Sequence, residues 1–567
     1  MIASHDMRAQ RLLFGAFLLC VLLLVSSGCA HRPPAAAIAS AHPAATQAGM
    51  EILAEGGNAF DAAVAVSAVL AVVEPYSSGL GGGGFWLLHR AEDGHQVMVD
   101  GRERAPLAAM RDLYLDDSGD VVPGLSISGA LAAGIPGEPA ALAHIAEHYG
   151  RMPLAQSLAP AIGLARTGFA VDATYRRLAG IRLAELQDDP ETAAIFLANG
   201  VIPPLGQRIV QADLAVTLEA LAQSGRAGFY AGPVARRLVE GVRQAGGIWS
   251  LDDLAQYQVV EREPVSGRYR DLRVISAAPP SSGGAVLVTM LNILEGFPLE
   301  RYDDVTRTHV IIEAMRRAYR DRALYLGDPD FLDVPVTELT SREYAASLRA
   351  SIRLERATSS EGFPAVPATS EGQDTTHFSV LDRDGNRVAA TLSINYPFGA
   401  CLTPPGTGVL LNDEMDDFSA KPGASNVYGL VGAEANAIAP GKRPLSSMSP
   451  SFIESKDGVA ILGTPGGSRI ITMVLLAALD HAAGRLPESW VSLPRFHHQY
   501  LPDVIQYEAG AFDAALIEGL SARGHQLKLL DPSYGNMQAV YWDRKYRRVY
   551  AASDPRGIGA AAVEAVD

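Results

Sequence analysis

Two consecutive threonines, Thr375 and Thr376, lie about two-thirds of the way along the 567-residue chain and have the clearest potential for catalysis. A cut just before Thr375 would expose a free α-amino group beside the threonine hydroxyl. One residue would then supply both the nucleophile and the general base, as in the pairing of threonine with its own N-terminal amine in some acyl-transfer enzymes. A lone threonine more often simply begins a strand, so this interpretation depends on what surrounds Thr375.

The residues that follow Thr375 predict a β-hairpin. Strand-like segments lie on both sides of Asp384-Gly385, which is a typical two-residue hairpin turn. Centring the hairpin on this turn places Thr375 opposite Ile394, give or take one residue. Ser393 and Asn395 would then lie alongside the threonine, and either could be the partner of its amine or hydroxyl.

The segment just before Thr375 is suited to cleavage. Residues 352–374 are rich in Ser, Glu, Pro and Gly and have no periodicity, which predicts an exposed stretch. A protease, or the protein's own threonine, would reach a peptide bond here more easily than one inside a regular element.

A glycine pair downstream could stabilise an anionic intermediate. Gly466 and Gly467 follow the strand-like residues 459–461 and precede an apolar helix that is predicted to begin at Ile470. Backbone N–H groups at a helix N-terminus have the positive end of the helix dipole behind them, which suits an oxyanion hole. A plain tight turn is the alternative explanation for the same residues.

Charged and hydroxyl side chains elsewhere could hold an amino-acid head group. Arg102 offers a guanidinium that can bind a carboxylate through two hydrogen bonds. Glu414 and Asp417 could bind an ammonium group, and Ser446 and Ser447 offer hydroxyls. Together these residues would hold a zwitterionic α-amino acid, although each alone could be a solvated or structural residue.

The composition describes an ordered globular protein. Hydrophobic residues make up 48 % and charged residues 19 %, and a net charge of −16 argues against binding to nucleic acid. The length fits about three or four domains, or one interlocked αββα unit. Three cysteines are too few for a disulfide framework, and no Cys/His cluster has zinc-finger spacing.

The first residues predict an export signal of the lipoprotein type. Arg8 and Arg11 precede the apolar residues 12–25, a stretch too short to span a bilayer comfortably. Residues 25–29, which end in Ser27-Gly28-Cys29, then resemble a lipoprotein cleavage box, so that residues 1–28 would be removed and Cys29 lipidated. Ser26 departs from the aliphatic residue that the box prefers.

Ordinary signal cleavage near Ala30 is the alternative, and either route exports the protein. We expect a periplasmic location with a membrane anchor at Cys29, in the outer membrane if the host is Gram-negative, because Ala30 follows the cysteine. Residues 29–43, rich in Ala and Pro, are predicted to be a tether.

Several long motifs are similar to those of the gamma-glutamyltranspeptidase (glutathione hydrolase) family. The resemblance runs from about residue 44 to the end of the chain, in the family's order. The matching segments are residues 55–65, 100–106, 279–284, 375–377, 412–419, 428–432, 443–450 and 466–469.

This resemblance implies a fold and a processing event. Members of the family are N-terminal-nucleophile hydrolases with a four-layer αββα fold, made as one precursor that cleaves itself. Cleavage would fall between Asp374 and Thr375. It would give a large subunit, residues 44–374, and a small subunit, residues 375–567, that remain together as a heterodimer.

The resemblance also implies roles for individual residues, with no cofactor or metal among them. Thr375 would be the nucleophile, supported by Ser393, with Gly466 and Gly467 as the oxyanion hole. The substrate α-carboxylate would be held by Arg102, Ser446 and Ser447, and its α-amino group by Asn395, Glu414 and Asp417. Tyr428 lies in the segment that matches the family's lid loop, residues 422–440, whose presence favours ordinary γ-glutamyl chemistry.

The implied reaction is cleavage of the γ-glutamyl amide of glutathione and related compounds through an ester on Thr375. Water, or an amino acid or dipeptide, would then accept the γ-glutamyl group. A related acylase, acting on glutaryl-cephalosporin or poly-γ-glutamate, is the alternative within the family. Outside it, His144, Glu147 and His148 fit the H-x-x-E-H signature of some zinc proteases. A non-enzymatic exported binding protein would require the threonine to be inert.

Overall fold

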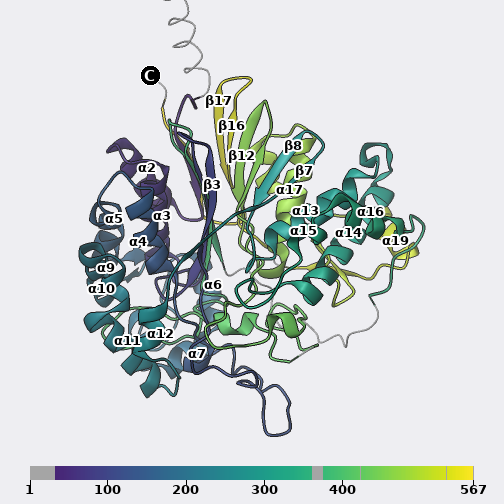
Figure 1. The fold of residues 1–567 in the computed structure, drawn as a ribbon. Coiled ribbons are helices and arrows are strands. Elements are labelled where there is room, and N and C mark those ends of the chain that lie inside the picture. Colours follow the sequence, from purple (N-terminus) through teal and green to yellow (C-terminus); the bar gives the residue numbers. More distant parts are fainter. Residues whose placement is uncertain (1–31, 361–374, 422, 532, 566–567) are drawn as a thin grey trace, which may run out of the picture.

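The computed structural model describes residues 32–565 except 361–374, 422 and 532. Two β-sheets pack face to face in the centre, and helices cover the outer face of each sheet (Figure 1). This is the predicted four-layer αββα arrangement. The predicted signal peptide, Cys29 and Asp374 lie outside the described residues.

The first sheet has seven strands in the order β18-β1-β9-β10-β2-β3-β6, with every neighbouring pair antiparallel. Its strands are β1 (Ala37–Ser40), β2 (Gly83–Arg90), β3 (His95–Gly101), β6 (Val260–Arg262), β9 (Thr376–Leu381), β10 (Arg387–Ser393) and β18 (Ala560–Val563). The sheet therefore combines segments from both ends and from the middle of the chain.

The second sheet has six strands in the order β17-β16-β12-β11-β8-β7, also antiparallel. They are β7 (Val265–Tyr269), β8 (Leu272–Ser276), β11 (Ser451–Glu454), β12 (Gly458–Gly463), β16 (Gln538–Asp543) and β17 (Arg548–Ser553). Two small sheets complete the strands: β13 (Phe496–His497), β14 (Ile505–Glu508) and β15 (Leu527–Leu530), and the pair β4 (Phe169–Ala170) and β5 (Arg208–Ile209).

Alternating side chains explain how each sheet is buried on both faces. Ala37 and Ala39 of β1 belong to the core between the sheets, together with Phe452 of β11, whereas Ile38 packs into the core beneath the helices. Successive residues of a strand point to opposite faces, so a strand in an inner layer places every side chain, apolar or polar, in one of two buried cores. β9 and β10 are buried along their whole length for this reason.

The helices of the first outer layer come from the N-terminal half. They are α2 (Pro43–Ala54), α3 (Ala59–Val73), α4 (Glu138–His148), α5 (Leu154–Thr167), α6 (Ala173–Ile181), α7 (Leu183–Asp188), α8 (Pro190–Phe196), α9 (Ala212–Ser224), α10 (Arg226–Tyr230), α11 (Gly232–Gln244) and α12 (Leu251–Gln256). Every residue of α3 is buried, as its apolar sequence predicts. Asn58 and Asp61 form a capping box at its N-terminus.

The second outer layer lies on the other side of the molecule (Figure 1). It contains α13 (Gly283–Glu295), α14 (Asp304–Tyr325), α15 (Val336–Leu339), α16 (Arg342–Ala350), α17 (Ile470–Ala482), α18 (Pro487–Ser492) and α19 (Ala514–Ala522). Helices α13 and α17 bury apolar residues against the second sheet, and α14 packs against α13. Among the described helices, none combines the length and the apolar character that crossing a lipid bilayer requires.

The predicted tether of residues 29–43 is wrong beyond its first residues. Ala35 to Ala41 are buried, and β1 hydrogen-bonds to β18 on one side and to β9 on the other. A run of alanines suggests a linker because it carries little apolar surface. Here the small side chains fit the narrow space between two sheets, so the segment is a central strand.

Candidate active site

Thr375 lies directly before β9, opposite the end of β10. The ladder pairs Thr376 with Leu392, so the next residue along, Ser393, stands opposite Thr375. This register lies one residue from the predicted one, within the stated tolerance, and it decides between the two candidate partners. The Oγ atoms of Thr375 and Ser393 are 3.3 Å apart, and the Ser393 hydroxyl accepts a hydrogen bond of 2.9 Å from the backbone N–H of Asn395.

A single pocket gathers most of the predicted site residues around Thr375. It is lined by Thr375, Ser393, Asn395, Glu414, Asp417, Tyr428, Leu430, Ser446, Ser447, Met448, Gly467, Ser468 and Ile470. Segments from four regions of the small-subunit half therefore meet here: the hairpin with Asn395, the loop from residue 412 to 431, the segment from Ser446 to Met448, and the loop that leads into α17. Two predicted residues, Arg102 and Gly466, do not line it.

The glycine pair forms a sharp bend between β12 and α17. Gly466 has φ 139° and Gly467 has φ 57°, a left-handed backbone that favours glycine. Gly467 begins a single 3₁₀ turn, Gly467–Arg469, which leads into α17. Within the described part of the chain, neither glycine N–H donates a hydrogen bond. These donors could therefore receive a developing negative charge.

The predicted lid residue Tyr428 is packed onto this bend. Its hydroxyl donates a hydrogen bond of 2.7 Å to the backbone oxygen of Asn395, and its ring leaves no room for a Cβ on Gly467. Gln499 joins the two loops, because its amide N–H₂ bonds to the backbone oxygens of Tyr428 (3.3 Å) and Gly429 (3.1 Å) while its oxygen accepts from Ser468 (2.6 Å). The sequence gives no signal for Gln499.

Arg102 is fully buried and bonds to the acids that were expected to bind the substrate amine. Its guanidinium forms ion pairs with Glu414 and, at 2.6 Å, with Asp417, and its Nε donates to the backbone oxygen of Pro444 at 3.1 Å. A direct bond from Arg102 to a substrate carboxylate stays a prediction. The structure shows that the guanidinium of Arg102 is the counter-charge of Glu414 and Asp417 and holds both carboxylates in place.

Burial raises the pKa values of two carboxyl groups beside Arg102, those of Glu414 and Glu103. Burial is the largest influence on Glu414, and the positive charge of Arg102 opposes it. Burial likewise raises the pKa of Glu103, with the negative charge of Glu414 acting in the same direction. Arg102 is thus the group that allows negative charge to persist here.

A second buried arginine, Arg322 of α14, was not predicted. Its Nη2 donates to the Oγ of Ser447 at 3.1 Å, and its Nε donates to the Oγ of Ser282 at 3.0 Å. It therefore fixes the orientation of one of the two expected carboxylate-binding serines. Its position inside an amphipathic helix gave no indication of this role, because only tertiary packing brings α14 to the serine loop.

We expect Arg102→Ala both to raise KM for γ-substituted glutamate donors and to lower the melting temperature. Removing one partner of a buried ion pair leaves Glu414, Asp417 and Glu103 without compensation, which typically costs about 3–5 kcal/mol. Arg111→Ala is the matched control, because Arg111 pairs with Glu434 at the surface (3.1 Å) and should cost about 1 kcal/mol or less. Thermal unfolding and steady-state kinetics measure the two effects; an unchanged melting temperature would contradict the counter-charge role.

The H-x-x-E-H segment lies on α4 and does not contribute to the pocket. His144 Nε2 is 2.9 Å from Oε1 of Glu261, and neither His144, Glu147 nor His148 lines the pocket with Thr375. Within the described residues, the one cluster with spacing suitable for a metal ion is elsewhere, at His309, Glu313 and His525. There the carboxylate of Glu313 already accepts from two arginines and from Thr358.

We expect turnover to survive dialysis against a chelator. The proposed nucleophile and oxyanion donors are all protein groups, so metal removal should leave kcat/KM within experimental error. His144→Ala provides a matched test of the zinc-protease signature and should retain activity. Activity that is lost on chelation and restored by zinc would revive the metalloprotease interpretation.

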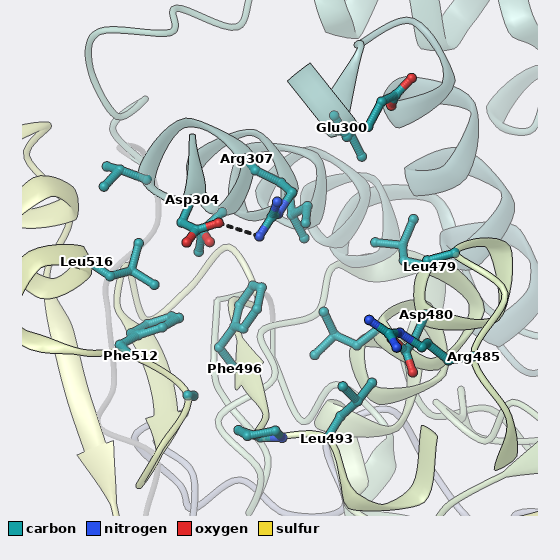
Figure 2. A pocket seen from close by; sticks show the side chains of 18 of the residues that line it. Glu300, Asp304, Arg307, Leu479, Asp480, Arg485, Leu493, Phe496, Phe512 and Leu516 are labelled. Atoms are coloured by element: carbon teal, nitrogen blue, oxygen red, sulfur yellow. Dashed lines mark hydrogen bonds and ion pairs between the residues drawn. The ribbon is translucent and has the colours of Figure 1, made fainter. Parts of the chain in front are cut away.

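A cavity of about 810 Å³ lies away from Thr375, between α14, α17 and the start of α19 (Figure 2). Phe496, Phe512 and Leu516 line it, and Arg307 pairs with Asp304 at 2.5 Å near its edge. None of the predicted catalytic or binding residues reaches it. The predicted catalytic and binding residues that line a pocket therefore lie at the smaller one, around Thr375.

The chain is similar to known proteins along most of its length. The profile of the family described as Gamma-glutamyltranspeptidase matches residues 45–564. Over 530 residues the chain is 44 % identical to a glutathione hydrolase proenzyme of Escherichia coli (strain K12), covering 92 % of this chain and 90 % of that protein.

Two solved structures extend the comparison. The cephalosporin acylase from Bacillus halodurans has a TM-score of 0.83 at 29 % identity and covers 94 % of this chain and 96 % of that chain. The gamma-glutamyltranspeptidase of Helicobacter pylori has a TM-score of 0.55 at 40 % identity and covers 56 % of this chain and 92 % of that chain.

Proposed function

Because this chain belongs to the gamma-glutamyltranspeptidase family, we propose that Thr375 is the nucleophile with which it cleaves γ-glutamyl amides. The protein is a glutathione hydrolase and gamma-glutamyltransferase with an N-terminal-nucleophile hydrolase fold. The observation that best supports the role of Thr375 is the pocket in which its hydroxyl lies with Ser393, Gly467 and five of the residues proposed to hold the donor head group, Asn395, Glu414, Asp417, Ser446 and Ser447.

The mechanism follows from the positions of these groups. The Thr375 hydroxyl attacks the γ-amide carbonyl carbon while the α-amine of the same residue accepts its proton. The negative charge that develops on the carbonyl oxygen is stabilised by the N–H groups of Gly466 and Gly467, and one such donor is typically worth about 3 kcal/mol. Collapse of the intermediate breaks the C–N bond, and the amine passes the proton to the leaving nitrogen.

The resulting ester between the γ-glutamyl group and Thr375 is then resolved. Water yields glutamate, and an amino acid or dipeptide yields a new γ-glutamyl compound. Ser393 supports the nucleophile through its Oγ, and Tyr428 covers the pocket from the side of Gly467. The residues proposed for the donor head group are Arg102, Asn395, Glu414, Asp417, Ser446 and Ser447.

We further propose that cleavage between Asp374 and Thr375 creates the catalytic amine. The Escherichia coli relative is named a proenzyme, and the matched chain of the Helicobacter pylori structure covers only 56 % of this chain, which supports a processed enzyme of two chains. The large chain would supply Arg102 and the small chain would supply Thr375. Neither chain alone would hold the complete site.

Incubation of purified enzyme with glutathione, with and without glycylglycine, tests the function. We expect glutamate in the first case and additional γ-glutamylglycylglycine in the second. The acylase alternative has support from the fold similarity to a cephalosporin acylase. Glutaryl-7-aminocephalosporanic acid in a parallel incubation distinguishes it, because a glutaryl group lacks the amine that Asn395, Glu414 and Asp417 would bind. Faster release from the glutaryl substrate than from glutathione would favour the acylase.

We propose that the protein is exported and held at the periplasmic side of a membrane by lipid on Cys29. The support is the sequence of the leader, residues 1–28, together with Ser27-Gly28-Cys29. Mass spectrometry of the large chain should find diacylglycerol on an N-terminal Cys29. An unmodified N-terminus beyond Cys29 would remove the anchor and leave export intact.

A further inference from the structure

Thr375 borders a second cavity, of about 60 Å³, that shares no other residue with the donor pocket. Its walls include Glu74, Tyr76, Thr174, Arg177, Asn536 and Arg556. The nucleophile therefore stands between two separate spaces. One contains the residues proposed for the γ-glutamyl donor, and the other contains a different set of polar groups that the mechanism above does not use.

Glu74 provides a buried carboxylate in this second cavity. It caps the C-terminus of α3, is only 3 % exposed, and accepts a hydrogen bond of 2.7 Å from the Oγ1 of Thr376. Burial raises its pKa to about 7, and the negative charge of Asp172 contributes to the rise. A positively charged group placed beside Glu74 would be stabilised by both carboxylates and would restore the ionised form.

Arg177 of α6 provides the opposite charge. It is exposed, and its guanidinium forms no hydrogen bond or ion pair with any other residue that the structure describes. Arg556, in contrast, forms ion pairs with Glu508 at 2.8 Å and with Asp554 at 3.0 Å. Arg177 is thus the guanidinium of this cavity that is available to an incoming carboxylate.

We propose that this second cavity binds the acceptor of the transfer reaction, a small amino acid or dipeptide in its zwitterionic form. The acceptor ammonium would lie near Glu74 and Thr375, and its carboxylate would bind Arg177. The proposal rests on the function proposed above and adds the location of the second substrate. A volume of about 60 Å³ admits a few water molecules, each of which needs roughly 10–15 Å³ by this measure, so glycine is favoured as the first residue.

The transfer step balances with these groups. The acceptor ammonium loses one proton to bulk water, and the neutral amine attacks the ester carbonyl carbon. A C–N bond forms and the C–Oγ bond to Thr375 breaks. The second proton of the amine passes through the α-amine of Thr375 to the departing Oγ, so the enzyme returns to its starting state. In the absence of an acceptor, water occupies the same cavity and yields glutamate.

The test separates donor chemistry from acceptor binding. Arg177→Gln removes the charge at an exposed helical position, and Arg236→Gln on α11 is the matched control, because Arg236 is also exposed and lies outside both cavities. For Arg177→Gln we expect the KM for glycylglycine to rise roughly ten- to one-hundred-fold, the usual effect of losing one hydrogen bond between charged groups. Hydrolysis of γ-glutamyl-p-nitroanilide, whose leaving group carries no carboxylate for Arg177 to bind, should stay within two-fold of wild type for both variants.

A second acceptor sharpens the experiment. Glycylglycinamide lacks the carboxylate, so its KM should be the same for wild type and Arg177→Gln. An equal rise in KM for both acceptors, or no rise for glycylglycine, would overturn the proposed role of Arg177. Loss of all γ-glutamyl turnover by the wild-type protein would instead contradict the proposed function, and the two failures are thereby distinguished.

Discussion

Thr375→Ala is expected to remain a single uncut chain without measurable γ-glutamyl turnover. The same hydroxyl would cut the chain and attack the substrate, so its removal abolishes both reactions. Thr375→Val keeps the volume and branching of the side chain and should behave identically. Thr375→Ser keeps the hydroxyl and, after cleavage, the α-amine, so it should mature slowly and retain part of the activity.

Gel electrophoresis, N-terminal sequencing and glutathione turnover measure these outcomes. The small chain of the wild-type protein should begin Thr-Thr-His-Phe. The melting temperatures of the uncut Thr375→Val and Thr375→Ala proteins should be the same. Equal values would show that the loss of activity does not come from unfolding. Normal activity in an uncut Thr375→Ala protein would refute the assignment of the nucleophile, because no other residue is proposed for that role.

Gly467→Ala is expected to lower kcat/KM roughly 100- to 1,000-fold, the range for loss of one oxyanion-hole donor. Two features of the structure lead to this expectation. Gly467 has φ 57°, which an alanine adopts at a cost, and a Cβ there would lie 2.7 Å from the ring of Tyr428. The bend and the lid residue would both have to move, so the amide donor would no longer point at the reacting oxygen.

Gly484→Ala is the matched control for this variant. Gly484 also has a positive φ, 81°, but a Cβ there would meet nothing within 4 Å. It should therefore lose about 1 kcal/mol of stability from backbone strain and keep its kcat/KM. If both variants lost activity to the same extent, backbone strain alone would explain the result and the role of the Gly467 amide would be refuted.

The hairpin and its threonine could be predicted because their signals are local. An Asp-Gly turn between two strand-like segments fixes the pairing to within one residue, and β9 and β10 form as expected. The uncertainty of one residue in the pairing register mattered, because neighbouring residues of a strand face opposite sides of the sheet. Ser393 and Asn395 could be separated only when the ladder itself was seen.

Several residues around the site could not be found in this way. Arg322, Gln499 and Glu74 are single polar residues in segments without a motif, and each reaches the site through contacts between distant parts of the chain. Conversely, the alanine-rich residues before position 43 suggested a linker. Composition reports how much apolar surface a segment carries, whereas the space between two sheets is set by the whole fold.

The position of β1 also determines the order in which the enzyme can be made. β1 precedes the proposed cut, yet both of its neighbours, β9 and β18, follow it. During translation β1 leaves the ribosome long before either neighbour, so the sheet closes only when almost the entire chain is available. The peptide bond before Thr375 thus keeps the late strands at a high local concentration around β1. A gene split at this bond would lose that advantage, because one translated half would have to insert a strand between two strands of the other.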